Sequence, residues 1–210
     1  MSSSLILSTY KILTRDISLY VPEPGKIVEA FKEDKNRNIF AAAPYWARVW
    51  PASIAMATYI EKNKEFFANK KVLELAAGLG LPSLIAASYA SEVCCSDYLE
   101  EALSVIQSSI ALNSITNMYC RLIDWNNVPA DADADVLLLS DINYEPAAFD
   151  TLFLVLQKFI QQGTSVILTT PQRLMAKPFI TRLFPFIRHQ EEISAIIGEQ
   201  QSFISLYVLG

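Results

Sequence analysis

Charged residues are few in this sequence: they make up 19% of its 210 residues, whereas hydrophobic residues make up 52%. This is not the composition of a disordered chain, because disorder goes with low hydrophobicity and high charge. The net charge of −5 leaves no excess of basic residues, so we expect no nucleic-acid partner. The length fits a single domain with a sizeable core.

Histidine and cysteine are also scarce. The three cysteines are Cys94, Cys95 and Cys120, and an odd number without regular spacing argues against a disulfide framework and for a reducing compartment. Cys94 and Cys95 fall in a stretch that we expect to be a buried strand, which makes them unreactive core thiols. The one histidine, His189, lies near a strand start and is expected to be an ordinary surface residue, so no metal site is predicted.

Long hydrophobic runs are missing as well. No stretch approaches the roughly 20 uninterrupted apolar residues of a membrane-spanning helix. Residues 1–10 lack both the basic residues and the long apolar run of a secretory signal. We therefore expect a soluble, cytoplasmic protein that has no membrane partner and is a monomer.

The N-terminal part of the chain predicts a small β appendage. Residues 5–14 and 16–21 alternate in hydrophobicity and read as two antiparallel strands. The charged residues 32–38 are expected to be solvated. We expect residues 1–40 to form a hairpin extension packed on the core and residues 41–210 to form the main domain, as one structural domain overall.

From residue 51 onward, helices and strands alternate, which predicts an α/β fold with parallel strands and right-handed crossovers. The last two strands have too few residues between them for a parallel crossover, so they predict a C-terminal antiparallel hairpin on a mostly parallel sheet. The predicted helices are 53–67, 82–89, 100–113, 147–161 and 177–184, and the predicted strands are 71–76, 92–96, 118–123, 135–140, 165–170, 191–197 and 202–209.

A glycine-bearing turn follows the first strand of this alternating region. Ala76, Gly78 and Gly80 lie where a strand gives way to a helix, which is where open sheets bind ligands. A dinucleotide fingerprint would place a third glycine at Ser83, and Glu74 would repel a phosphate. The same carboxylate favours the cationic S-adenosylmethionine, either directly or through the loop or a water. The alternative is a tight turn with a partly buried glutamate.

Acidic and aromatic residues follow the next two strands. Asp97, with Tyr98 beside it, is placed to accept hydrogen bonds from both hydroxyls of a ribose, or else to cap the following helix. Asp124 can accept from an adenine amine, and Trp125 offers the adenine ring a flat apolar surface or covers the edge of the core. Asp97 by itself does not distinguish S-adenosylmethionine from a nicotinamide cofactor.

The fourth strand ends in residues suited to a substrate nitrogen. Ser140 is expected to contact the cofactor. Asp141, Asn143 and Tyr144 can orient an amine and relay its proton, since such enzymes work mainly by positioning. The alternative is a turn stabilised by aspartate with a buried tyrosine.

Residues 44–53 are dense in aromatic side chains. Tyr45, Trp46 and Trp50 lie within six residues. They can form the wall of a pocket and exclude water, or they can fill the joint between the appendage and the sheet.

Taken in order, these motifs resemble seven-β-strand methyltransferase family 16, which contains protein-lysine methyltransferases and nicotinamide N-methyltransferase-like members. The likeness covers residues 40–170, with a similar hairpin before it. It implies a Rossmann-like class I methyltransferase sheet with S-adenosylmethionine as the cofactor. It also implies that Asp141 and Tyr144 face the substrate, and that the cofactor is lined by Trp50, Glu74, Gly78, Gly80, Asp97 and Trp125. The matching segments are Val49–Ser53, Leu73–Gly80, Asp97, Asp124–Trp125 and Asp141–Tyr144.

The chain departs from the family pattern at two positions: Ala76 stands where the family has glycine, and Glu145 where it often has histidine. We predict methyl transfer from S-adenosylmethionine to a nitrogen, most simply that of a protein lysine. A small-molecule amine or pyridine, or a binding module without activity, are the alternatives. Glu74, Ser83 and the terminal hairpin argue against a nicotinamide-dependent oxidoreductase. Arg173, with other basic residues late in the chain, is expected on a solvated helix face.

Overall fold

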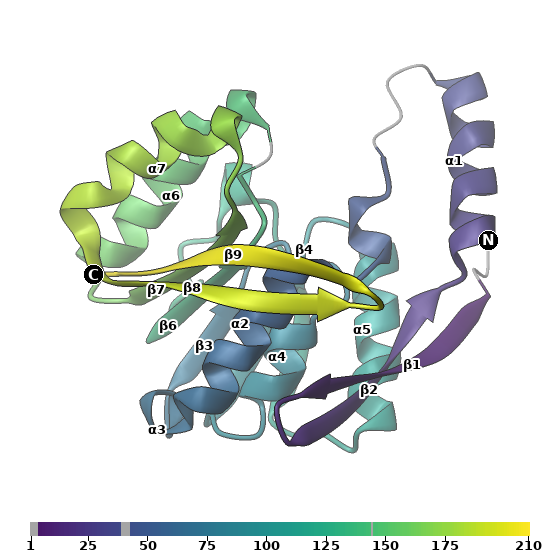
Figure 1. Cartoon of the computed structure of the whole chain (residues 1–210), viewed down its shortest axis with the longest axis horizontal. Helices are drawn as coiled ribbons and strands as arrows, with labels where there is room; N and C mark the ends of the chain where they lie inside the picture. The colour runs from purple at the N-terminus through teal and green to yellow at the C-terminus, as the bar shows by residue number, and fades with distance from the viewer. Residues whose placement is uncertain (1–3, 39–42, 144) are drawn as a thin grey trace.

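The computed structural model describes residues 4–38, 43–143 and 145–210 (Figure 1). Tyr144, one of the expected substrate residues, therefore lies outside the described part. Among the helices in these ranges, none has the length and apolarity needed to cross a membrane.

A seven-stranded sheet organises the molecule, with the strand order β5-β4-β3-β6-β7-β9-β8. The first five strands in this order are parallel, and β9 is antiparallel to both β7 and β8. The predicted mostly parallel sheet with a terminal hairpin is confirmed. The chain leaves β3 toward β4 on one side and reaches β6 on the other, which creates a switch point between β3 and β6. The strands are β3 (Lys71–Glu74), β4 (Glu92–Asp97), β5 (Met118–Leu122), β6 (Val136–Ser140), β7 (Ser165–Pro171), β8 (Ile187–Ile197) and β9 (Gln200–Leu209).

Helices cover both faces of this sheet (Figure 1). One face packs against α2 (Pro51–Lys62), α4 (Leu81–Ala86) and α5 (Glu100–Leu112), and the other against α6 (Phe149–Gln161) and α7 (Lys177–Leu183). Because successive side chains of a strand point to opposite faces, each inner strand contributes to two separate cores.

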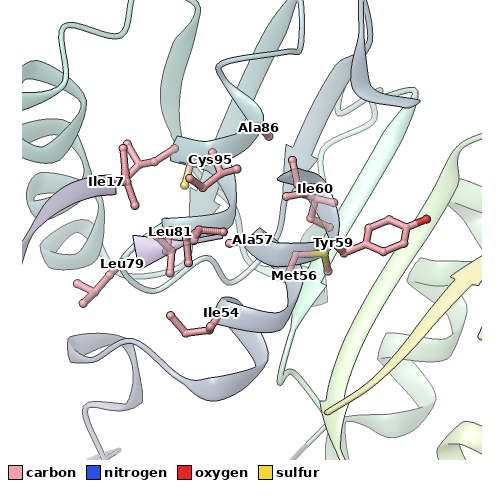
Figure 2. Close-up of a cluster of buried hydrophobic side chains, with 14 of the residues drawn as sticks. Ile17, Ile54, Met56, Ala57, Tyr59, Ile60, Leu79, Leu81, Ala86 and Cys95 are labelled. Carbon is pink, nitrogen blue, oxygen red and sulfur yellow. The ribbon is translucent and has the colours of Figure 1, made fainter. Parts of the chain in front are cut away.

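The strand β6 shows this alternation directly. Leu138 belongs to the core under α2, α4 and α5, whereas Leu137 and Leu139 belong to the core under α6 and α7. Figure 2 shows part of the first core, where Ile54 and Ile60 of α2 and Leu81 of α4 lie among other buried side chains. The sheet is thus buried on both sides, as parallel sheets require.

The N-terminal hairpin consists of β1 (Leu5–Ile12) and β2 (Arg15–Pro22), close to the two predicted strands. Its inner side chains join the core that contains α2. The backbone N–H of Tyr20 donates to Ser109 Oγ of α5 over 3.0 Å, and Asn113 Nδ2 donates to the Ser18 carbonyl over 2.7 Å. The hairpin is therefore joined to α5 by both apolar packing and hydrogen bonds.

Several boundaries differ from the prediction. Residues 24–37 form a helix, α1 (Pro24–Arg37), that was not predicted, although residues 32–36 of the expected charged stretch are indeed exposed on it. The predicted helix 53–67 is interrupted after Lys62, and α3 (Lys64–Phe67) follows. Asn63 lies at the break, where its Nδ2 donates to the Tyr59 carbonyl over 2.9 Å and competes with the helix backbone.

The C-terminal hairpin is longer than predicted, because β8 begins at Ile187 and only Gly198 and Glu199 connect it to β9. His189 lies on β8 with an exposed side chain, as expected. Short 3-10 turns complete the connections: η1 (Tyr45–Ala47), η2 (Trp125–Asn127), η3 (Pro146–Ala148), η4 (Leu174–Ala176) and η5 (Phe184–Phe186).

Candidate functional site

A cavity of about 340 Å³ opens at the carboxyl ends of β3, β4 and β6, next to the switch point. Its size is within the range of small-molecule sites. Nine of the predicted site residues line it, namely Trp50, Ala76, Gly78, Gly80, Asp97, Tyr98, Trp125, Ser140 and Asp141. Residues that lie far apart in the sequence are thus brought together around one space.

The glycine turn forms the floor of this cavity with an unusual backbone. Ala76, Gly78 and Gly80 all have left-handed conformations, with φ of 53°, 59° and 69°. A β-carbon at Gly78 would lie 3.2 Å from the carbonyl oxygen of Trp46, so only glycine fits the close approach of the two chain segments without displacement. Ala76 adopts the same region at a cost of about 1–2 kcal/mol, since its β-carbon crowds the backbone there.

Asp97 is the last residue of β4; it lines the cavity and is only 3% exposed. Its Oδ2 accepts from the Gly78 N–H over 3.0 Å, and its Oδ1 accepts from the Leu99 N–H over 3.1 Å. Burial raises the pKa of this carboxyl, and the backbone hydrogen bonds oppose that change. A carboxylate has about four acceptor sites, so Asp97 can support the turn and still accept from a ligand hydroxyl.

Glu74 does not line the cavity. Its side chain is 1% exposed, and its Oε2 accepts from the Ser83 backbone N–H over 3.0 Å and from Ser83 Oγ over 2.5 Å. Burial raises the pKa of Glu74 to about 8, so the side chain holds its proton at neutral pH. A direct contact of Glu74 with a sulfonium is therefore not supported, and a role for Glu74 through the loop remains a prediction.

Trp125 lines the cavity, whereas the neighbouring Asp124 does not. Trp125 lines the cavity with a partly buried ring, as expected for a surface that receives an adenine. Asp124 is exposed and does not line it, because Asp124 Oδ1 accepts from the Asn126 backbone N–H over 2.9 Å and from Asn126 Nδ2 over 2.8 Å. Its carboxylate caps η2, which leaves the expected contact with the adenine amine without structural support.

Asp141 lines the cavity in a left-handed conformation, with φ of 59°. Its carboxylate forms a bidentate ion pair with Arg173, in which Arg173 Nη2 donates to Oδ2 over 2.9 Å and Nη1 donates to Oδ1. The pair raises the pKa of Arg173. The expectation that Arg173 lies on a solvated helix face was wrong, because it comes from the loop after β7 and lines the same cavity.

Asn143 and Ser140 also take different places. Asn143 is fully buried, and its Oδ1 accepts from Thr170 Oγ1 over 2.7 Å, so the structure does not bring this side chain to the cavity. The expected contact of Asn143 with a substrate is therefore not supported. Ser140 lines the cavity at the end of β6.

The aromatic segment forms one wall of the cavity. Trp50 Nε1 donates to the Tyr45 carbonyl over 2.7 Å, and the Tyr45 and Trp50 ring centroids are 6.1 Å apart. The guanidinium carbon of Arg48 lies 3.6 Å from the centroid of the Trp50 ring. Tyr45, Trp46, Arg48 and Trp50 all line the cavity, so the segment does more than fill a joint.

Three charged residues of the cavity were missed as site residues from the sequence: Arg48, Glu145 and Arg173. Glu145 is exposed, and no basic residue in the described part of the chain forms an ion pair with it. Its position directly after the Asp141–Tyr144 motif was a usable signal. Arg173 had no comparable signal, because it meets Asp141 only through the adjacency of β6 and β7.

Solved structures with the same fold support this description of the architecture. The N-methyltransferase NodS from Bradyrhizobium japonicum, in complex with S-adenosyl-L-homocysteine, matches with a TM-score of 0.61 and 11% identity over 84% of this chain and 97% of that one. The 16S rRNA methyltransferase RsmC of T. thermophilus matches with a TM-score of 0.61 and 16% identity over 100% of this chain and 51% of that one. At these identities the likeness shows the fold alone.

Sequence relatives are more informative. The electron transfer flavoprotein beta subunit lysine methyltransferase of Danio rerio is 34% identical over 62% of this chain and 51% of that protein. The EEF1A lysine methyltransferase 3 of Xenopus tropicalis is 32% identical over 65% of this chain and 60% of that protein. The histone-arginine methyltransferase METTL23 of Xenopus laevis is 30% identical over 56% of this chain and 53% of that protein. This chain spans about half to two thirds of the length of such relatives.

The region of the chain that matches a known family contains every residue that lines the cavity. A family model described as lysine methyltransferase matches residues 41–184, which is more than half of the chain and includes the glycine turn, Asp97, Trp125 and Asp141. The chain therefore belongs to this lysine methyltransferase family.

Proposed function

We propose that this protein is an S-adenosylmethionine-dependent methyltransferase that modifies a nitrogen, with the ε-amine of a protein lysine as the acceptor. The observation that supports it best is Asp97, a buried carboxylate on the cavity wall that is bonded to the left-handed glycine turn. That arrangement suits a ligand that carries a ribose with two free hydroxyls.

The lining residues fit the parts of such a cofactor. Asp97 accepts from the ribose, and Trp125 offers a flat face to the adenine. The turn at Gly78 allows the backbone to approach the ligand without a side chain in between. When bound, the cofactor supplies an electrophilic methyl group on a sulfonium.

The chain's own contribution to the reaction is positioning and the exclusion of water. A lysine amine attacks only as the neutral base, so its ammonium group must first release a proton to water. Its lone pair would then have to face the methyl carbon, so that the N–C bond forms as the C–S bond breaks and the sulfur keeps the electron pair of that bond. Trp50 and Tyr45 shield the cavity. Glu145 is the lining carboxylate that can attract and hold a cationic side chain, since Asp141 already holds Arg173.

The names of the relatives support a protein acceptor, because they include both lysine and arginine methyltransferases. We favour lysine because the matched family model is described by that residue. A small-molecule amine or pyridine is the alternative acceptor. A binding module without turnover is a second candidate, favoured by the ion pair that occupies Asp141.

We further propose a cytoplasmic, monomeric enzyme. Its three cysteines are free in the structure, and burial raises the pKa of the Cys95 thiol, which makes it unreactive. Free thiols of this kind agree with a reducing compartment.

Calorimetric titration with S-adenosylmethionine and S-adenosylhomocysteine tests the proposal. We expect micromolar binding to the wild type, and a loss of about tenfold or more for Asp97→Asn, because the ribose then loses a charged acceptor. Asp124→Asn is the matched control, since Asp124 caps η2 outside the cavity. Circular dichroism of each variant checks folding.

The outcomes separate the candidates. Binding of neither ligand to the wild type would overturn the proposal. Tight binding without methylation of any protein or small amine in a cell extract supplied with labelled cofactor would indicate the binding module. Binding of NAD, without binding of either of these ligands, would indicate an oxidoreductase.

A further inference from the structure

Arg48 is a cation in the cavity wall, and no carboxylate in the described part of the chain pairs with it. It is exposed, it lines the cavity, and its guanidinium carbon lies 3.6 Å from the Trp50 ring centroid. Within the described residues, no aspartate or glutamate forms an ion pair with it. Arg173, the other arginine of the cavity, is neutralised by Asp141. Arg48 is thus a positive charge available to a ligand.

The contacts of Gly78 locate Arg48 relative to the ribose site. The Gly78 N–H donates to Asp97, and on its other side the Gly78 backbone approaches the carbonyl of Trp46 so closely that a β-carbon would lie 3.2 Å from it. Trp46 belongs to η1, and Arg48 follows that turn directly. Asp97, Gly78 and Arg48 all line the same cavity, so a ligand that places its ribose at Asp97 and crosses the glycine turn has Arg48 within the same space.

The chemistry of the ligand's far end suits this residue. S-adenosylmethionine and S-adenosylhomocysteine both end in an α-amino acid with a negatively charged carboxylate. A guanidinium binds a carboxylate with two parallel hydrogen bonds. The contact with the Trp50 ring, 3.6 Å from the guanidinium carbon to the centroid, holds the group in the cavity wall without occupying it with a hydrogen-bond acceptor, so its N–H groups can donate to a ligand carboxylate.

We infer that Arg48 binds the carboxylate at the amino-acid end of the cofactor. The inference rests on the proposed function, since it requires a ligand of this class. It assigns the recognition of that carboxylate to a residue two positions before Trp50, in the aromatic wall rather than in the glycine turn.

Two ligands that differ only at this end provide the test. 5′-Methylthioadenosine contains the adenosine and the sulfur but no amino acid. S-Adenosylhomocysteine contains the adenosine, the sulfur and the amino acid. We expect Arg48→Met to weaken S-adenosylhomocysteine by about tenfold to a hundredfold, as for the loss of hydrogen bonds to a charged group. The affinity for 5′-methylthioadenosine should change by less than about twofold. No substrate is present in this titration, so a substrate carboxylate cannot produce the difference.

Arg182→Met is the matched control. Arg182 is also stacked on an aromatic ring, with its guanidinium carbon 4.1 Å from the Phe153 centroid, and it does not line the cavity. Its removal should leave both affinities unchanged. Arg48→Lys should recover part of the loss, because it restores the charge without the second hydrogen bond.

The remaining outcomes overturn the inference in distinguishable ways. An equal loss for both ligands in Arg48→Met would mean that Arg48 only supports the Trp50 wall. Unchanged binding of S-adenosylhomocysteine would mean that the carboxylate lies elsewhere. If the wild type bound neither ligand, the proposed function itself would fail.

Discussion

Glu74 illustrates how the surroundings of one residue determine its chemistry. Its folded pKa of about 8 lies above the ordinary value of 4.5, mainly because of burial. Between these two values the folded state binds more protons than the unfolded state, so the free energy of unfolding falls as the pH rises from about 4.5 to about 8. Glu74→Gln keeps an acceptor for Ser83 but cannot ionise. We expect the variant to gain stability relative to the wild type when the pH rises from 5 to 8, as measured by urea denaturation.

Glu199→Gln is the control for this prediction, because Glu199 lies exposed in the turn between β8 and β9. It should not alter the pH dependence. A constant difference between wild type and Glu74→Gln at both pH values would show that Glu74 is already ionised in the folded protein. Its negative charge would then be available near the turn.

The turn between β1 and β2 contains a leucine in a backbone conformation that lowers the stability of the protein. Ile12 pairs with Arg15, so Leu13 and Thr14 form the turn, and Leu13 has a left-handed φ of 55°. A leucine there costs about 1–2 kcal/mol of stability. Glycine removes this cost but loses about 0.5–1 kcal/mol, because its unfolded state has more conformational freedom. We expect Leu13→Gly to raise the free energy of unfolding by about 0.5–1 kcal/mol in urea titrations.

Ile6→Gly is the matched control, because Ile6 has the same 45% exposure as Leu13 but lies in the extended strand β1. Glycine within a strand is unfavourable. The two substitutions should therefore change stability in opposite directions. A loss of stability in both variants would show that Leu13 contributes packing that outweighs its backbone cost.

At the scale of the whole molecule, the question is whether the hairpin and the sheet unfold together. Leu19 of β2 is 0% exposed and belongs to the core under α2, α4 and α5. Because a buried Leu→Ala change costs about 2–5 kcal/mol, Leu19→Ala should lower the stability of the entire protein by that amount in one cooperative thermal transition. Calorimetry measures both the shift and the number of transitions.

Leu7→Ala in the neighbouring strand provides the comparison, since Leu7 is 59% exposed. Its effect should stay within about 0.5 kcal/mol. If Leu19→Ala instead produced an early separate transition, residues 1–40 would behave as an independent unit. The expectation of one structural domain, which is still a prediction, would then be wrong.

Local features of the chain were predictable because they depend on neighbouring residues. The alternation of strands and helices follows from hydrophobic periodicity. Asp97 and Asp141 line the cavity because one is the last residue of an apolar strand and the other directly follows one. The helix α1 was missed because its sequence is rich in polar and charged residues, and none of its described side chains is fully buried.

Features that depend on contacts between distant segments were decided only by the tertiary structure. The sequence by itself determined the α/β class, the glycine turn and the carboxylates at the strand ends. It could not show that Asp141 pairs with Arg173, that Glu74 bonds to Ser83 and has a raised pKa, or that Arg48 stacks on Trp50 beside the cavity. Charge state and partner choice depend on burial and on which strands and loops become neighbours, and these arise only when the chain is packed.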